Sequence, residues 1–179
     1  QLLSEPRLAK LTLTYDETSD RIQLTDRTGA AISTAAYEAE QVMDRLHALL
    51  PDRFQLTPRL CRLSNGGYTD TQAPWISLGG TASLADFSKV THTSVDNRRF
   101  RLNLIIETQT PFEEFEWAGK HICIGDVELE IIEPVGRCAA INVDPDTADA
   151  SQNHLRTMLQ IYGHTNFGMF ARIVKKGTL

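Results

Sequence analysis

The stretch VELEIIEPVGRCAAINVDPDT, residues 127–147, is the most informative part of the chain for the fold, because it places one cysteine between a strand and a tight turn. The apolar residues from Val127 to Pro134 predict a strand. Residues 144–147 predict a turn, since proline presets φ and aspartate accepts hydrogen bonds from its own backbone. We therefore expect Cys138 near a strand end, where Arg137 favours the thiolate that attacks electrophiles and binds soft metals. The alternative is a small, buried, apolar cysteine.

Short strands and a few helices are predicted along the rest of the chain. Alternating apolar and polar residues at 11–15 and 21–24 predict a hairpin. Thr34 is expected to cap a helix that runs to about Leu50. Further strands are expected at residues 55–60, 75–78, 100–106, 121–124 and 127–132, with a helix at 152–162 and a last strand at 168–174. This mainly β (α+β) pattern predicts a β-barrel or sandwich.

Composition narrows the classes of function. The chain has 179 residues, is 41% hydrophobic and carries a formal charge of −5, and it lacks the Lys/Arg cluster that nucleic-acid binding needs. It also lacks an apolar run long enough to cross a bilayer, so we expect no membrane partner and a cytoplasmic location. The three cysteines, Cys61, Cys123 and Cys138, have neither disulfide-type nor zinc-type spacing.

Other candidate residues have simpler interpretations. The five histidines show no metal-ligand spacing. Cys123 shares a strand face with His121 and is interpreted as core. The glycine pairs at 66–67 and 79–80 are interpreted as turns. Glu113, Glu114 and Glu116 are interpreted as a solvated face that could steer a basic electron-transfer partner.

Several motifs then occur in one order: Arg99-Phe100-Arg101-Leu102-Asn103, Pro111-Phe112-Glu113-Glu114 with Trp117, Ile124-Gly125-Asp126-Val127, Arg137-Cys138, Val143–Thr147 and Asn166-Phe167-Gly168. From about Gly67 to Leu179 this series resembles the MOSC domain, the molybdenum cofactor sulfurase C-terminal module, and it is similar to the bacterial MOSC reductases and the mitochondrial amidoxime reducing component. The resemblance implies a MOSC-type β-barrel with a few peripheral helices over residues 67–179. Residues 1–66 are expected to be a remnant of the N-terminal β-barrel domain, without its Val-Lys-Ser phosphate-binding segment.

The resemblance also implies a site for the molybdenum cofactor, Mo-molybdopterin, rather than pyridoxal phosphate. Cys138 would be the catalytic cysteine and the protein ligand to molybdenum, and Arg101 and Asn103 would contact the pterin from one face of the strand at 100–106, which Arg99 shares. Leu102 stands where the family usually has proline. Further cofactor contacts are expected from Gly136, Arg137, Asp70, Thr71, Phe167 and Gly168. Asp70 and Thr71 fit a simple turn equally well. Gly168 can alternatively be required only because the backbone at that position has no room for a side chain.

The implied activity is reduction of small N-hydroxylated compounds by an oxidoreductase. Electrons would come from an external donor of the ferredoxin, flavoprotein or cytochrome type, because the chain has too few cysteines for a four-cysteine iron–sulfur cluster. Two alternatives stay open. One is a carrier module in which Cys138 holds a persulfide or delivers the cofactor without reductase activity. The other is a domain that keeps the fold without a cofactor. In the chain as given, Cys138, Arg101 and Asn103 are expected to converge on one pocket that stays empty, because the phosphate-binding segment is absent.

Overall fold

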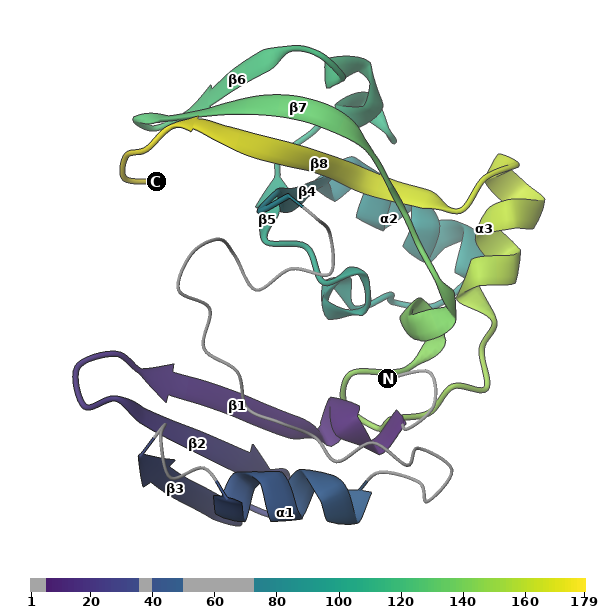
Figure 1. Ribbon diagram of the computed structural model, residues 1–179. Helices are drawn as coiled ribbons and strands as arrows, with labels where there is room; N and C mark the ends of the chain where they lie inside the picture. The colour runs from purple at the N-terminus through teal and green to yellow at the C-terminus, as the bar shows by residue number, and fades with distance from the viewer. Residues whose placement is uncertain (1–5, 36–39, 50–72) are drawn as a thin grey trace. The chain divides into compact units, whose positions relative to one another are not determined.

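The computed structural model describes residues 6–35, 40–49 and 73–179. The chain divides into two compact units, and each contains its own sheet (Figure 1). Unit 1 comprises Gln1–Arg62 and Val143–Gln152, and unit 2 comprises Leu63–Asn142 and Asn153–Leu179. The expected domain boundary between residues 66 and 67 lies outside the described residues, as do the expected strand at 55–60 and the expected contacts Asp70 and Thr71.

Unit 1 is built on an antiparallel sheet in the order β1-β2-β3. The 3-10 helix η1 (Pro6–Lys10) leads into β1 (Leu11–Asp16), β2 (Arg21–Asp26) and β3 (Ala31–Ala35), and the helix α1 (Glu40–Leu49) follows. The predicted hairpin is confirmed, with Leu13 opposite Leu24. The predicted start of the following helix is wrong, because Thr34 lies in β3 opposite Ile22 and α1 begins at Glu40.

A second tight turn explains this correction. The Oδ1 atom of Asp26 accepts hydrogen bonds from the backbone N–H of Thr28 at 2.9 Å and of Ala30 at 3.1 Å, and Gly29 has φ +83°. This turn sends the chain back along β2 as a third strand. Ile22, Leu24 and Val42 then form the core of unit 1.

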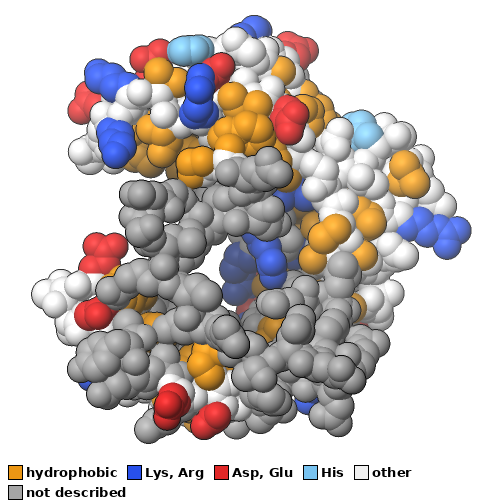
Figure 2. All heavy atoms as spheres, in the orientation of Figure 1, with side chains coloured by type: hydrophobic (Ala, Val, Ile, Leu, Met, Phe, Trp, Pro, Cys, Tyr) orange, Lys and Arg blue, Asp and Glu red, His pale blue; other side chains and the backbone are white. Residues whose placement is uncertain are grey.

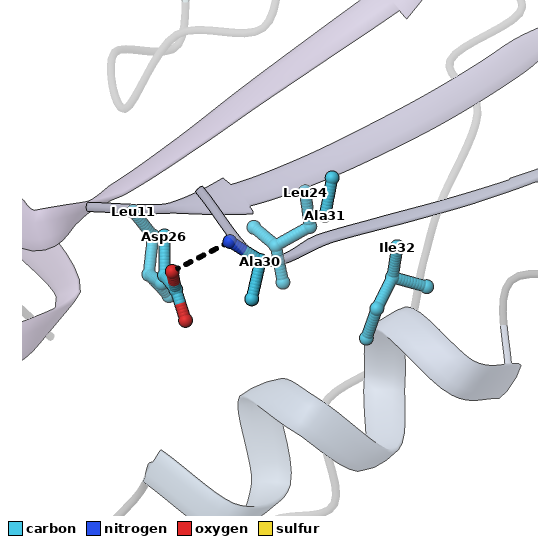
Figure 3. Close-up of a pocket in the computed structure, with 6 residues that line it drawn as sticks. All are labelled: Leu11, Leu24, Asp26, Ala30, Ala31 and Ile32. Atoms are coloured by element: carbon cyan, nitrogen blue, oxygen red, sulfur yellow. Dashed lines mark hydrogen bonds between the residues drawn. The ribbon is translucent and has the colours of Figure 1, made fainter. Parts of the chain in front are cut away.

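A pocket of about 210 Å³ opens beside this turn (Figure 3). Its lining residues are Leu11, Leu24, Asp26, Ala30, Ala31 and Ile32. The volume is below the ~300 Å³ at which ligand sites begin. None of the predicted site residues is among these lining residues.

Unit 2 contains a five-stranded sheet in the order β5-β4-β8-β7-β6 that curls into a half-barrel (Figure 1). Its strands are β4 (Ile76–Gly80), β5 (Leu104–Ile106), β6 (His121–Ile124), β7 (Val127–Gly136) and β8 (Asn166–Lys175). Only the β4–β5 pair, among the described strands, is parallel. Register shifts near Pro134 interrupt the β7–β8 ladder, and such irregularities bend and twist a strand. The predominantly β fold with a few helices agrees with the predicted MOSC-type barrel.

Helices complete unit 2. They are α2 (Thr81–Thr91), α3 (His154–Tyr162) and the 3-10 helices η3 (Asn97–Phe100), η4 (Glu113–Trp117) and η5 (Ala139–Asn142). The Asn153 side chain caps α3, close to the predicted start, whereas α2 was missed because Gly80, interpreted as a turn, is its N-cap. Within residues 6–35, 40–49 and 73–179, the helices are too short or too polar to cross a bilayer.

Aromatic rings and aliphatic side chains form the core of unit 2. The rings of Phe100 and Phe167 stack with their centroids 3.8 Å apart, and Phe87 packs against both. Between α2 and α3, the hydroxyl of Tyr162 donates to Asp86 Oδ2 at 2.7 Å. Partial burial, this hydrogen bond and the negative charge of Asp86 raise the pKa of Tyr162 far above its usual range.

Glu114 is buried, which contradicts its interpretation as part of a solvated face. Its side chain is 0% exposed. Its carboxylate accepts hydrogen bonds from the Gly80 N–H at 3.1 Å and from the Ser83 hydroxyl at 2.8 Å. The start of a helix leaves backbone N–H groups without partners and favours a negative charge, so this carboxylate anchors the beginning of α2.

Cys123 also differs from its prediction. His121 and Cys123 share one face of β6 as expected, but that face is exposed, and Ile122 and Ile124 pack on the core instead. β6 pairs antiparallel with β7, and an antiparallel sheet can pack one face on the core while the other face meets water.

Charged side chains of both signs are interspersed over the surface that carries β6, β7 and β8 (Figure 2).

Candidate functional site

Residues 99–103 form the end of η3 and a following turn rather than the predicted strand. The Asp96 side chain accepts from the Arg98 N–H and starts η3, and Arg101 follows in the left-handed conformation at φ +49°. Strand pairing begins only at Leu104. The alternation that would place Arg99, Arg101 and Asn103 on one strand face is therefore wrong. The side chains of Arg101 and Asn103 are nevertheless both exposed.

Arg137 joins this turn to two other parts of unit 2. Its Nη1 donates to the Phe100 carbonyl at 2.7 Å, and its Nε donates to the Phe167 carbonyl at 2.8 Å. Its backbone N–H donates to the Thr165 carbonyl at 2.9 Å. A planar guanidinium holds several acceptors in fixed directions. Arg137 thus acts as a clamp that links the end of β7 to Phe100, which precedes Arg101, and to Phe167 at the start of β8.

Cys138 follows directly after this clamp. Its side chain is exposed, so the alternative of a buried apolar cysteine is wrong. Its carbonyl accepts from the Ile141 N–H at 3.2 Å, which starts η5. The thiol therefore stands between a strand and a short helix, as the sequence predicts. Arg137, which the sequence predicts to favour the thiolate, donates from Nη1 and Nε to main-chain carbonyls.

Asn103 is held by β4. The Ser77 N–H donates to Asn103 Oδ1 at 2.8 Å, and the Asn103 N–H donates to the Ser77 carbonyl at 2.9 Å. The oxygen end of this amide thus faces β4. Sequence reasoning missed Ser77, because nothing in a single serine on a strand indicates which side chain it contacts.

Gly168 and Phe167 lie at the start of β8, where the backbone packs closely against β4 and Leu102. A Cβ at Gly168, where φ is +73°, would lie 2.3 Å from the Leu78 carbonyl oxygen and 2.9 Å from Leu102 Cδ2. A Cβ at Gly79 would lie 2.7 Å from Leu102 Cδ1. We call this space the Leu102 notch, formed by Gly79 and Gly168. Phe167 is fully buried, and its carbonyl receives the Arg137 clamp.

The structure therefore gathers most of the predicted residues around Arg137. Gly136, Phe167 and Gly168 lie on the paired ends of β7 and β8, and Arg137 directly follows β7. Arg101 follows Phe100, whose carbonyl accepts from Arg137. The exposed side chains among the predicted residues include the Cys138 thiol, the Arg101 guanidinium and the Asn103 amide. A soft thiolate suits molybdenum, and forked donors suit an anionic, carbonyl-rich pterin, so the donor set fits the cofactor.

No cluster of three or more His, Cys, Asp or Glu residues that could hold a metal ion occurs among the described residues. The described residues around Cys138 therefore differ from protein-only metal sites, in which three or four side chains converge.

Comparisons with known proteins found one family match and several relatives. The sequence model of the MOSC domain matches residues 72–179. The chain is 39% identical over 74 residues to a molybdenum cofactor sulfurase of Danio rerio, which is 41% of this chain and 9% of that protein. It is 38% identical over 73 residues to molybdenum cofactor sulfurase 3 of Aedes aegypti, and 36% identical over 73 residues to the sulfurase of Anopheles gambiae. Each of these matches covers 40% of this chain and 9% of the relative, so the chain spans about a tenth of the relatives' length.

Proposed function

This chain belongs to the MOSC domain family, and on that premise we propose that unit 2 binds the molybdenum cofactor with Cys138 as the protein ligand to molybdenum. One observation carries the proposal. The Arg137 guanidinium fixes the segment of Cys138 to the residue before Arg101, through the bond to the Phe100 carbonyl. An exposed thiol and an exposed guanidinium are thus held by one clamp.

Each exposed residue has a separate task in this proposal. Cys138 would bind as a thiolate, because the deprotonated sulfur is the metal ligand. The Arg101 guanidinium would donate paired hydrogen bonds to anionic or carbonyl groups of the pterin. The Nδ2 group of Asn103 would donate to a further acceptor. When bound, the cofactor would supply two-electron oxygen-transfer chemistry, and the protein would supply binding and orientation.

We assign reduction of small N-hydroxylated compounds as the activity. The N–O bond is broken, two electrons and two protons are taken up, and the products are the N–H compound and water. The two electrons come from an external ferredoxin, flavoprotein or cytochrome. Glu116 is exposed and could face a basic electron donor, whereas Glu114 is buried and the half-buried Glu113 carboxylate accepts from the Gln109 and Thr110 N–H groups.

The second candidate is a module that carries sulfur or the cofactor without reducing a substrate. The names of the relatives favour it, since they are molybdenum cofactor sulfurases. In this function Cys138 would hold a persulfide, or would hold the cofactor during delivery to another protein. An exposed thiol serves either step.

The first test measures molybdenum per chain after expression in a host that makes the cofactor. We expect Cys138→Ser to lose at least about tenfold in molybdenum content, because a hydroxyl is a harder and far less acidic ligand than a thiol. Cys123→Ser is the matched control, since Cys123 is also exposed, and it should retain the metal. Equal molybdenum in the parent and in both variants would make the assignment of Cys138 wrong.

The second test separates the two activities. The molybdenum-loaded parent is given an amidoxime and a chemically reduced dye, and the amidine is quantified. The parent is also treated with a sulfur donor, and the mass of the Cys138 peptide is measured for the addition of one sulfur atom. Amidine formation that Cys138→Ser abolishes supports the reductase. Sulfur addition without amidine formation supports the carrier, and a parent without molybdenum or added sulfur supports a cofactor-free domain.

A further inference from the structure

We propose that Ser77 is a positioning residue that fixes the side-chain amide of Asn103 so that its two N–H donors face the cofactor. The inference rests on the proposed function. Ser77 lies in β4 and is 8% exposed. Its backbone N–H lies 2.8 Å from the oxygen assigned as Asn103 Oδ1. A backbone N–H can only donate, so the side-chain atom that faces it must be the acceptor.

The Ser77 hydroxyl strengthens this orientation. Its Oγ lies 3.1 Å from Asn103 Oδ1 and 3.3 Å from the Arg101 carbonyl oxygen, and it accepts from the Asn103 N–H at 3.3 Å. A hydroxyl has one proton and can donate to either oxygen. One serine thereby ties the backbone of both expected pterin contacts, Arg101 and Asn103, to a central strand.

The consequence concerns the opposite end of the amide. With Oδ1 turned to β4, the Nδ2 group points away from the strand, and the side chain is exposed. Within the described part of the chain, Nδ2 has no hydrogen-bond partner, so both of its donors are available to a ligand. An amide that cannot flip loses less freedom when it binds, which raises affinity without a new contact. The pterin ring, rich in carbonyl and ring-nitrogen acceptors, is the chemical class that such donors recognise.

The experiment measures cofactor release from the full chain. Purified, molybdenum-loaded protein is diluted, and the fluorescence of the released pterin is followed over time. Loss of one neutral hydrogen bond that orients a ligand contact corresponds to a factor of about 3 to 10, and we expect Ser77→Ala to accelerate release by that factor. Ser77→Thr, which keeps the hydroxyl, should restore slow release.

Two controls separate positioning from general destabilisation. Ser88→Ala removes another serine hydroxyl of unit 2, which accepts from the Val95 N–H at 3.1 Å, and it should leave the release rate unchanged. In an Asn103→Ala background, Ser77→Ala should have no further effect on release, because the oriented group is already absent. Thermal unfolding of each variant is recorded in parallel.

The possible results are distinct. Fast release in Ser77→Ala, rescue by threonine and no effect in the Asn103→Ala background support the inference. Three results would overturn the inference about Ser77 and leave the proposed function standing. They are release at the parent rate in Ser77→Ala, equal acceleration in Ser88→Ala, and an undiminished effect of Ser77→Ala on release in the Asn103→Ala background. A parent chain that holds no molybdenum overturns both.

Discussion

Glu114 offers a sharp test of how unit 2 is held together. The carboxylate accepts from the Gly80 N–H at 3.1 Å and from the Ser83 hydroxyl at 2.8 Å, and the Ser83 hydroxyl in turn accepts from the Phe112 N–H at 2.8 Å. Glu114→Ala leaves two buried donors without an acceptor. Each unpaired buried donor costs about 1–3 kcal/mol, so we expect unit 2 to lose ~2–6 kcal/mol of unfolding free energy.

Glu114→Gln distinguishes hydrogen bonding from charge. The glutamine oxygen can keep the bonds from Gly80 and Ser83, because Ser83 Oγ also lies 2.9 Å from Glu114 Oε1. The amide NH2 group would then lie beside the one remaining lone pair of the Ser83 oxygen. We therefore expect a loss of about 1 kcal/mol or less for this variant.

Denaturant unfolding followed by tryptophan fluorescence measures both effects. The chain has two tryptophans, and both Trp75 and Trp117 lie in unit 2, so the signal reports on that unit. Glu116→Ala is the matched control, because Glu116 is exposed in the same 3-10 helix, and it should stay within about 0.5 kcal/mol of the parent. A Glu114→Gln loss as large as that of alanine would refute this reasoning and show that the negative charge itself is required.

Two further predictions concern a glycine and a tyrosine. Gly168→Ala should destabilise unit 2 by more than the ~1–2 kcal/mol that a left-handed backbone costs alone, because the new Cβ would lie 2.3 Å from the Leu78 carbonyl oxygen. Gly163→Ala is the control, since Gly163 has φ +75° and open space around it. In the same denaturant assay it should cost only the backbone part. Because burial and the bond to Asp86 raise the pKa of Tyr162 above that of the unfolded chain, its stabilising contribution is complete below pH ~10 and is lost as the pH rises beyond it. Unfolding free energies at pH 8 to 11 should thus fall less steeply in Tyr162→Phe than in the parent, and equal slopes would contradict the assignment.

The sequence predicted the parts of the fold that local pattern determines. The strands at 121–124 and 127–132 and the helix ending at Tyr162 are present, because alternation, an Asn cap and a following glycine act within a few residues. The exposed Cys138 at a strand end was predicted for the same reason. The MOSC-type architecture came from motif order, which reports on the whole domain.

The wrong predictions depend on partners far away in sequence. Glu114 resembles its acidic neighbours, but its acceptors are matched to donors at Gly80 and Ser83, which lie on another element. Residues 100–103 alternate like a strand, yet Asp96 caps a 3-10 helix and the Arg137 guanidinium holds the Phe100 carbonyl. Periodicity carries no information about such contacts, so the side-chain directions at the site could not be derived from it.

The Leu102 notch has a consequence for how related sequences vary. Leu102 reaches Gly79 through one branch and Gly168 through the other. A proline at position 102, which the family pattern usually has, carries no branched methyl groups and leaves the space at position 79 open. Larger residues at position 79 should therefore accompany proline at 102, and small ones should accompany leucine. Position 168 should stay glycine in both groups, because its backbone at φ +73° excludes a side chain whatever stands opposite. We therefore expect position 79 to covary with position 102, and position 168 to stay invariant.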